Sequence, residues 1–221
     1  MSLKAKRNII ESIVSQNVRG IKSDARLEEL FASVSRCKTF AACLQETWRC
    51  GNDTLENGNF RLIHSGLDPE EQSTRGSQGV AIVLSARAVD SWRAAGSETH
   101  QDLGARVVAI RVLVRDESNR DVGVFLVSAY APVGTADNNV WDDFFANLSR
   151  CIARKQRGDI LLIGADTNSS MGCKSSIDQR FDGYRNVVGR FGLCHTNNAG
   201  ERFVTYLVVN SLTTLTTFFR K

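Results

Sequence analysis

The fold of this chain is decided by a central stretch in which two apolar runs flank a polar segment. It reads ARVVAIRVLV at residues 105–114, RDESNRD at 115–121 and VGVFLVSAY at 122–130. Both apolar runs are short and rich in β-branched and aromatic residues, which favours a strand over a buried helix. A parallel doubly wound sheet needs a helix after nearly every strand, and none separates these two.

Runs of the same kind continue toward both ends of the chain. The other predicted strands cover Ile9–Gln16, Ala41–Gln45, Phe60–His64, Gly79–Ser85 and Ile160–Gly164. Helical spacing of apolar residues predicts helices over Ser23–Ser35, Ala136–Arg154 and Arg202–Asn210. The stretch between Phe60 and Tyr130 holds four strands in succession without a convincing helix, which favours an α+β fold with an antiparallel sandwich at its centre. No repeat, low-complexity tract or linker divides residues 1–221, so we expect a single domain.

Composition excludes several classes of protein. Hydrophobic residues make up 42% and charged residues 24% of the 221 positions, the balance of a chain with a core rather than of a disordered one. No run approaches the roughly 18 residues of a membrane-spanning helix. Glu11 interrupts the apolar start, so we expect neither a membrane partner nor a secretion signal. The net charge of +4 permits a nucleic-acid partner without establishing one, and basic residues such as Arg106 and Arg111 are dispersed, as on solvated faces.

The cysteines and histidines show no metal-binding or disulfide pattern. No C-x-x-C pair occurs among the six cysteines, and His64, His100 and His195 lie far apart in the sequence. A zinc knuckle or a disulfide framework is therefore not expected. We interpret the thiols as reduced and mostly buried, in an intracellular protein.

Four apolar runs end on polar residues that a simple strand does not require. Asn17, Glu46 and Tyr130 stand at the ends of three runs, and Asp166 and Asn168 follow the run at 160–164. Strand ends at one rim of a sandwich can bring distant residues together, so we expect these residues to form one site. Two carboxylates, two carboxamides and a phenol suit a phosphate and a hard cation such as Mg²⁺.

Each of these residues also has a simpler explanation. Asn17 fits an ordinary turn, and Glu46 fits a surface charge. Tyr130 fits a half-buried aromatic residue at a strand end, and Asp166 with Asn168 fits an Asx turn. The order and context of all five together, rather than any one of them, favour a common site.

Five short motifs occur in the chain in a characteristic order. They are Asn17-Val18-Arg19-Gly20, Gln45-Glu46-Thr47-Trp48, Gly79-Val80-Ala81-Ile82, Ser128-Ala129-Tyr130-Ala131-Pro132 and Asp166-Thr167-Asn168-Ser169-Ser170-Met171-Gly172. In this order the sequence resembles the endonuclease/exonuclease/phosphatase superfamily. Within it, the Tyr-Ala-Pro and the Asp-x-Asn followed by Met-Gly resemble the endonuclease domains of non-LTR retrotransposons and the related craniofacial development protein 2-like sequences. The resemblance covers nearly the whole chain, from Ile9 to Phe219.

The resemblance implies a four-layered α/β-sandwich, with two packed mixed β-sheets flanked by helices. It also implies phosphodiester hydrolysis that depends on Mg²⁺ or Mn²⁺ and needs no small-molecule cofactor. By the same carry-over Glu46 binds the metal, and Asn17 helps to orient the metal or the phosphate. Tyr130 contacts the scissile phosphate, Asp166 orients or deprotonates the attacking water, and Asn168 holds the phosphate. The implied substrate is DNA, and the implied place of action is the nucleus.

The sequence departs from the family pattern in two places. Ala165 stands where the family usually has Gly before Asp-x-Asn. Family members also continue past the strand that Thr213–Phe219 is expected to match, with strands that carry an Asp and a closing Ser-Asp-His, whereas this sequence ends at Lys221. We therefore assign the family's catalytic histidine to no residue, interpret the chain as truncated at its C-terminus, and expect impaired activity.

Two alternatives remain open from the sequence. One is a non-catalytic DNA- or protein-binding remnant that keeps only the scaffold. The other is a phosphatase or RNA nuclease of the same superfamily. The sequence makes no prediction about the oligomeric state.

Overall fold

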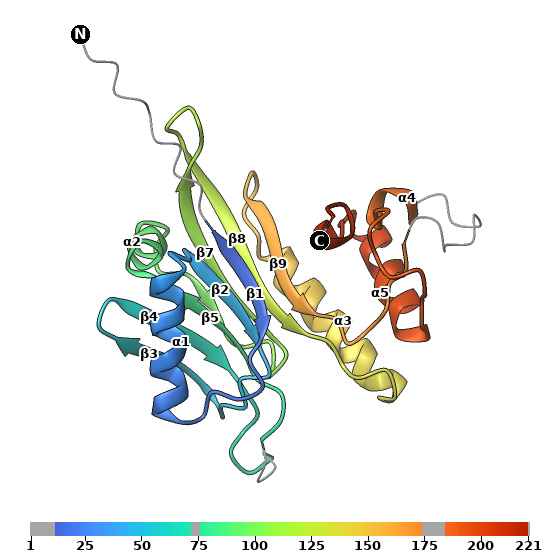
Figure 1. The fold of residues 1–221 in the computed structure, drawn as a ribbon, viewed down its shortest axis with the longest axis horizontal. Coiled ribbons are helices and arrows are strands. Elements are labelled where there is room, and N and C mark those ends of the chain that lie inside the picture. Colours follow the sequence, from blue (N-terminus) through green and yellow to red (C-terminus); the bar gives the residue numbers. More distant parts are fainter. Residues whose placement is uncertain (1–11, 72–75, 174–183, 221) are drawn as a thin grey trace. The chain divides into compact units, whose positions relative to one another are not determined.

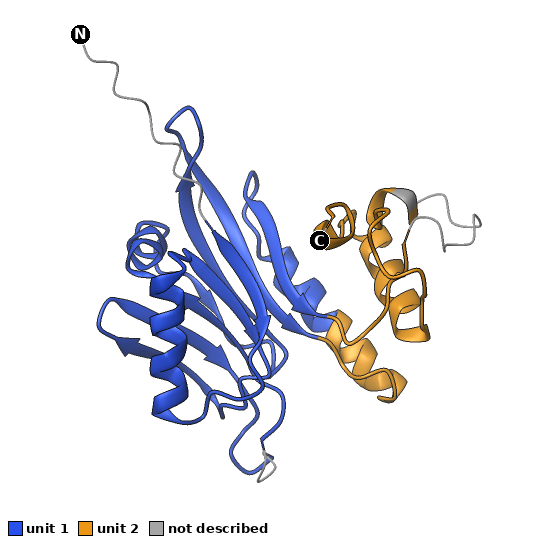
Figure 2. Ribbon diagram, viewed as in Figure 1, with its two compact units in different colours: residues 1–130, 146–166 blue, residues 131–145, 167–221 orange. Residues whose placement is uncertain are grey.

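The computed structural model describes residues 12–71, 76–173 and 184–220 (Figure 1). The chain falls into two compact units, Met1–Tyr130 with Ala146–Asp166 and Ala131–Phe145 with Thr167–Lys221, called unit 1 and unit 2 (Figure 2). Strands β1 to β9 all belong to unit 1. That the whole chain forms a single domain stays a prediction.

Unit 1 is built on two β-sheets. The first has the strand order β1-β2-β5-β4-β3, and the second has the order β6-β7-β8-β9. The bounds are β1 Ile13–Asn17, β2 Ala41–Gln45, β3 Asn52–Asn57, β4 Phe60–Ser65, β5 Val80–Leu84, β6 Thr99–His100, β7 Val107–Arg115, β8 Asp121–Tyr130 and β9 Ile160–Asp166. Every predicted strand in unit 1 is present to within a few residues, except that the start of Ile9–Gln16 lies outside the described residues.

Each sheet is antiparallel except at one edge. β1 runs parallel to β2, and β9 runs parallel to β8, whereas the other neighbouring strands are antiparallel. The sheets are therefore mixed, and the antiparallel centre expected from the strand succession stops at these two edge pairs. Because parallel neighbours run in one direction, each edge pair presents two strand C-termini on the same side.

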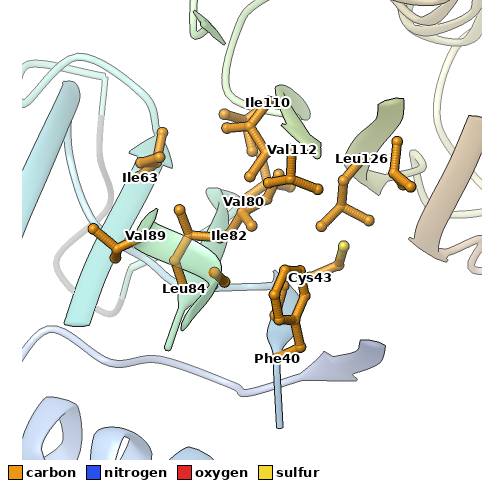
Figure 3. Close-up of a cluster of buried hydrophobic side chains, with 14 of the residues drawn as sticks. Phe40, Cys43, Ile63, Val80, Ile82, Leu84, Val89, Ile110, Val112 and Leu126 are labelled. Carbon is orange, nitrogen blue, oxygen red and sulfur yellow. The ribbon is translucent and has the colours of Figure 1, made fainter. Parts of the chain in front are cut away.

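The two sheets pack face to face over a core of mostly aliphatic side chains, with Phe40 and Cys43 among them (Figure 3). Cys43 of β2 and Ile82 of β5 come from the first sheet, and Ile110 of β7 and Leu126 of β8 come from the second. All four are completely buried. Alternate residues of each strand face this layer, as the two-residue period of a strand requires. The burial of these side chains is the main favourable contribution to folding.

Helix α1 (Asp24–Arg36) covers the outer face of the first sheet. Its N-cap is Ser23, whose hydroxyl accepts a hydrogen bond from a backbone N–H of the first turn. Its buried residues Leu27, Phe31 and Val34 recur at helical spacing and pack against β2, β4 and β5. The predicted helix over Ser23–Ser35 is thus confirmed.

Helix α3 (Asn138–Ala153) carries the apolar stripe that predicted a buried helix face. Trp141, Phe144 and Leu148 are buried, and Phe145 is partly buried. The C-terminal half of the helix belongs to unit 1. With two mixed sheets flanked by helices, the fold is the α+β sandwich that the sequence predicted.

Three elements of unit 1 were missed by the sequence prediction. The expectation that no helix lies between Phe60 and Tyr130 is wrong, because α2 (Ala86–Ala94) packs against β7 there. Only Ala88 and Val89 of this short helix are buried, which leaves too few apolar positions to reveal a helical period. The missed strands β3 and β6 lie at sheet edges, and β3 is mostly polar and exposed.

Unit 2 is mainly helical. It holds α4 (Tyr184–Val187), α5 (Asn198–Val209) and a 3₁₀ turn at Leu215–Thr217. α5 starts before the predicted Arg202 because Asn197 caps it through its side-chain oxygen. No helix among the described residues is long and apolar enough to cross a membrane.

The strand expected over Thr213–Phe219 is wrong. The Thr217 backbone N–H donates to the Thr214 carbonyl at 3.1 Å, which closes a 3₁₀ turn. The hydroxyls of the same two residues lie 2.8 Å apart, and Thr217 also donates to the Thr214 carbonyl. Local hydrogen bonds of this kind compete with the ladder of a sheet.

Candidate active site

The two parallel edge pairs bring four strand ends to the same region of unit 1. Asn17 is the last residue of β1 and pairs in register with Gln45, the last residue of β2, directly before Glu46. In the second sheet Tyr130 and Asp166 end β8 and β9 and lie opposite each other in the parallel register. The parallel pairing therefore explains why these polar residues follow apolar runs.

Four side chains at these strand ends form one hydrogen-bonded cluster: Asn17, Glu46, Tyr130 and Asp166. The Asn17 amide donates to Glu46 Oε1 at 2.7 Å and to Asp166 Oδ2 at 2.8 Å. The Tyr130 hydroxyl donates to the same Glu46 Oε1 at 3.1 Å. Tyr130 is buried, and the other three are partly exposed. The structure thus brings together four of the five residues that the sequence singled out, and we call them the carboxylate cluster.

The fifth residue, Asn168, belongs to unit 2. Its side-chain amide donates to the Ala131 carbonyl at 2.8 Å, within the same unit. Its backbone is left-handed, with φ of 45°. Asparagine adopts this conformation more readily than most residues do.

The loops that carry the cluster are held by a continuation of the β1–β2 pairing. Gly20 N donates to the Glu46 carbonyl at 2.7 Å, and Ile21 N donates to the Thr47 carbonyl at 2.9 Å. Gly20 has φ of +95°, and a Cβ there would lie 2.3 Å from the Trp48 ring. Only glycine allows this close approach. The first two sequence motifs therefore pack against each other for a steric reason.

The backbone at Glu46 is also left-handed, with φ of 55°. For a residue that carries a Cβ this conformation costs about 1 kcal/mol. The hydrogen bond from Gly20 to the Glu46 carbonyl, and that from Thr47 N to the Gly79 carbonyl at 3.0 Å, hold this turn in place. The carboxylate of Glu46 accepts hydrogen bonds from Asn17 of the first sheet and Tyr130 of the second, so the strained residue is also the one that joins the two sheets.

Gln45 lies directly beneath the cluster and was not singled out from the sequence. It is 1% exposed, and its amide donates to Ser128 Oγ and to the Gly164 carbonyl, both at 3.2 Å. Its carbonyl oxygen accepts from Ser15 Oγ at 3.4 Å. A buried amide bonded in this way links the two sheets where the cluster forms. A polar residue on the inward side of the apolar run AACLQ is the signal that could have revealed it.

Arg106 also belongs to this region, although the sequence analysis had assigned it to a solvated face. Its guanidinium lies 5.3 Å from the centre of the Tyr130 ring and donates to the Tyr130 carbonyl at 3.3 Å. Burial lowers the pKa of Arg106, yet an arginine remains charged in proteins. The cation therefore belongs to the surroundings of the cluster and not to a solvated face. Arg111, the other example, is paired with Asp159 at 2.9 Å.

The three histidines, all within the described residues, have surroundings of their own. His64 is buried in β4, and burial is the main cause that lowers its pKa. His100 contacts Glu98 at 3.1 Å, and His195 is exposed in unit 2. No imidazole among the described residues hydrogen-bonds to the carboxylate cluster, so the cluster's own titratable side chains are carboxylates and a phenol.

The donor set of the cluster fits a divalent cation with a small number of protein ligands. Glu46 Oε1 accepts two hydrogen bonds, whereas its Oε2 accepts none from the residues that the structure describes. Mg²⁺ typically takes one or two carboxylates and keeps several waters. Within the described chain no group of three or more Cys, His, Asp and Glu side chains forms a metal cage. Glu46, with Asp166 nearby, is therefore suited to an open, largely hydrated site.

Comparison with known proteins shows similarity at the level of the fold. No protein-family model and no curated protein matches the sequence. Among solved structures, the chain is similar to the catalytic domain of APE2 from Xenopus laevis, with a TM-score of 0.55 and 16% identity over 90% of this chain and 66% of that one. It is also similar to the AP endonuclease LMAP from Leishmania major, with a TM-score of 0.52 and 13% identity over 90% and 65%. The match thus spans less than two thirds of the length of either solved chain, and at this identity it establishes the fold.

Proposed function

We propose that this chain is a divalent-metal-dependent phosphodiesterase that acts on DNA. The observation that carries the proposal is the carboxylate cluster at the strand ends, in which one amide bridges Glu46 and Asp166. The similarity to nuclease structures supports a hydrolase fold. The finer assignment to the retroelement type rests on the sequence motifs around Tyr130 and Asp166.

In this proposal each residue of the cluster has one task. Glu46 holds the cation through the oxygen that accepts no hydrogen bond from a described residue. Asn17 fixes the two carboxylates relative to each other through its bridging amide. Mg²⁺ or Mn²⁺, when bound, neutralises charge that develops on the phosphate.

The other groups act on the water and the phosphate. The Asp166 carboxylate orients a water molecule and accepts its proton, the role of a general base. The Tyr130 side chain contacts the phosphate, and the neighbouring Arg106 adds a positive charge where a DNA backbone passes. We assign Asn168 to phosphate binding from its place in the motif.

A second candidate function is phosphate binding without turnover. The observation that favours it is Glu46 Oε2, which accepts no hydrogen bond from a described residue and can hold a cation beside a phosphate without any proton transfer at Asp166. Both functions require a cation at Glu46, and only hydrolysis requires a proton acceptor at Asp166. The two are therefore distinguished by different substitutions.

The test is nicking of supercoiled plasmid by the purified chain with Mg²⁺, beside Glu46→Gln, Asp166→Asn and the control Glu117→Gln. Glu117 is an exposed carboxylate in the turn between β7 and β8, and its substitution changes the net charge by the same amount. We expect the wild type and Glu117→Gln to nick equally, and both cluster variants to lose about 100-fold or more. Equal nicking by all four proteins would show contamination and refute the proposal. DNA binding by the wild type that needs Mg²⁺ but gives no nicking would favour the second candidate.

A further inference from the structure

Unit 2 contains two cysteines whose sulfur atoms lie close together. Cys173 Sγ and Cys194 Sγ are 2.9 Å apart, although both are thiols in the structure. Cys173 is completely buried and Cys194 is exposed. This juxtaposition differs from the sequence interpretation, in which spacing alone gave no reason to pair any two of the six cysteines.

The backbone explains why the two cysteines meet. Met171 and Thr196 form an antiparallel bridge, and Asn197 N donates to the Ser170 carbonyl at 3.2 Å beside it. The segments that carry Cys173 and Cys194 therefore run antiparallel to each other at this bridge, which brings the two cysteines within reach.

The hydrogen bond also identifies the kind of pair. Because the bond from Asn197 to Ser170 flanks the Met171–Thr196 bridge, that bridge is a non-hydrogen-bonded pair. The observation that bears on a disulfide is the distance of 2.9 Å between the two sulfur atoms, because a disulfide bond is about 2 Å long. The two segments also approach closely at Gly192, where a Cβ would lie 2.1 Å from the Gly172 carbonyl oxygen.

We propose that Cys173 and Cys194 form a reversible disulfide, a modification site that ties the segment after β9 to the segment before α5. The oxidant in this proposal is a peroxide, which reaches the exposed Cys194 before the buried Cys173. The Cys194 thiolate attacks the peroxide O–O bond and becomes a sulfenic acid, and the peroxide's other oxygen leaves as water after taking a proton. The Cys173 sulfur then attacks the sulfenic sulfur, and the hydroxyl leaves as water. In sum, two thiols and hydrogen peroxide give one disulfide and two waters.

The other cysteines provide internal comparisons. Cys43 and Cys151 are buried, and burial raises the pKa of each thiol to about 12. Both therefore react slowly with peroxide, because the thiolate is the reactive form. Cys37 is exposed at the end of α1, and its sulfur makes no contact with another cysteine of the described chain. It reports on the oxidation of an exposed thiol that has no neighbouring cysteine.

The test is peptide mapping by mass spectrometry, without reduction, of the full chain treated with hydrogen peroxide and then alkylated. We expect a cross-linked peptide that contains Cys173 and Cys194, in the wild type and in the control Cys37→Ser. It should be absent from Cys194→Ser and should disappear with dithiothreitol. Overoxidation of Cys194 without a cross-link, under conditions that also oxidise Cys37, would overturn the proposal.

Thermal unfolding gives a second and independent readout. A disulfide that fits the native positions restricts the unfolded chain, so the oxidised wild type should melt at a higher temperature than the reduced protein. Cys194→Ser should melt at the same temperature before and after treatment. An unchanged or lowered melting temperature of the cross-linked wild type would show that the native positions do not fit the bond. Neither readout depends on nuclease activity.

Discussion

Gly164→Ala is predicted to destabilise the protein, because it places a methyl group in close contact with the facing sheet. A Cβ at this position of β9 would lie 2.4 Å from Cys43 Cβ and 3.1 Å from Ser15 Cβ. Ordinary carbon contacts are about 3.5–4.0 Å, so the first overlap exceeds about 1 Å. Both partners are fixed by ladders, since β9 pairs with β8, and β2 pairs with β1 and β5. Overpacking of this kind costs about 1–3 kcal/mol, and we expect the upper half of that range.

Two further variants separate overpacking from a general effect of alanine. Gly134→Ala is the matched control, because the nearest side-chain atom, Ala199 Cβ, would lie 3.9 Å away and no positive φ is involved. It should change the free energy of unfolding by less than about 0.5 kcal/mol. Cys43→Gly removes the side chain that the new methyl group would overlap. In the double variant Gly164→Ala/Cys43→Gly the loss of unfolding free energy should therefore be smaller than the sum of the two single losses, by about 1 kcal/mol or more.

The assay is equilibrium urea unfolding, followed by tryptophan fluorescence and far-UV circular dichroism. Equal slopes for all variants would allow the midpoints to be compared as free energies. If Gly164→Ala unfolds within about 0.5 kcal/mol of the wild type, the close approach at this position has no energetic weight. Strict additivity in the double variant would refute direct contact between residues 43 and 164 as the cause.

Two other features give predictions of stability. Arg111 makes two 2.9 Å hydrogen bonds to Asp159 and thereby lowers the pKa of that carboxyl. This contribution is complete above the unfolded pKa near 4 and is lost as pH falls through the lower folded value. Asp159→Asn should cost about 2 kcal/mol at pH 7 and flatten the acid side of the stability profile measured by urea unfolding. Asn197→Ala should cost about 1 kcal/mol in the same assay, because the cap of α5 accepts from Gly200 N at 2.8 Å and from Ser170 N at 3.2 Å, whereas Asn197→Asp should retain most of the stability.

An element could be predicted well when its buried positions are apolar and form a clear pattern in the sequence. β2 and β5 are buried along their whole length, so their apolar runs gave bounds within a residue of the structure. β3 faces solvent at an edge, and α2 buries only two residues, so neither leaves a periodic pattern in the sequence. The turn at Leu215–Thr217 depends on local hydrogen bonds of threonine, a residue that is otherwise typical of strands.

In the candidate site, too, some residues could be predicted from the sequence, whereas others are identified only by how the strands pair and pack. Asn17, Glu46, Tyr130 and Asp166 could be predicted together because each ends an apolar run, and parallel edge strands align such ends. Arg106 gave no such signal, because its place beside Tyr130 depends on the pairing of β7 with β8. Its recognition needed the register of the sheet, which single residues do not encode.

The bridge from Asn17 to Asp166 also bears on when the site can form during folding. These two residues are 149 positions apart, and the Tyr130 to Glu46 contact spans 84. Contacts that close such long loops carry a large entropic cost and are slow to form. On a ribosome, the bridge cannot exist until Asp166 has emerged, after both sheets are otherwise complete. A cation held at Glu46, as proposed, would therefore bind the folded unit 1 in preference to the unfolded chain, and the amount bound at saturation would report the fraction of chains in which the cluster has formed.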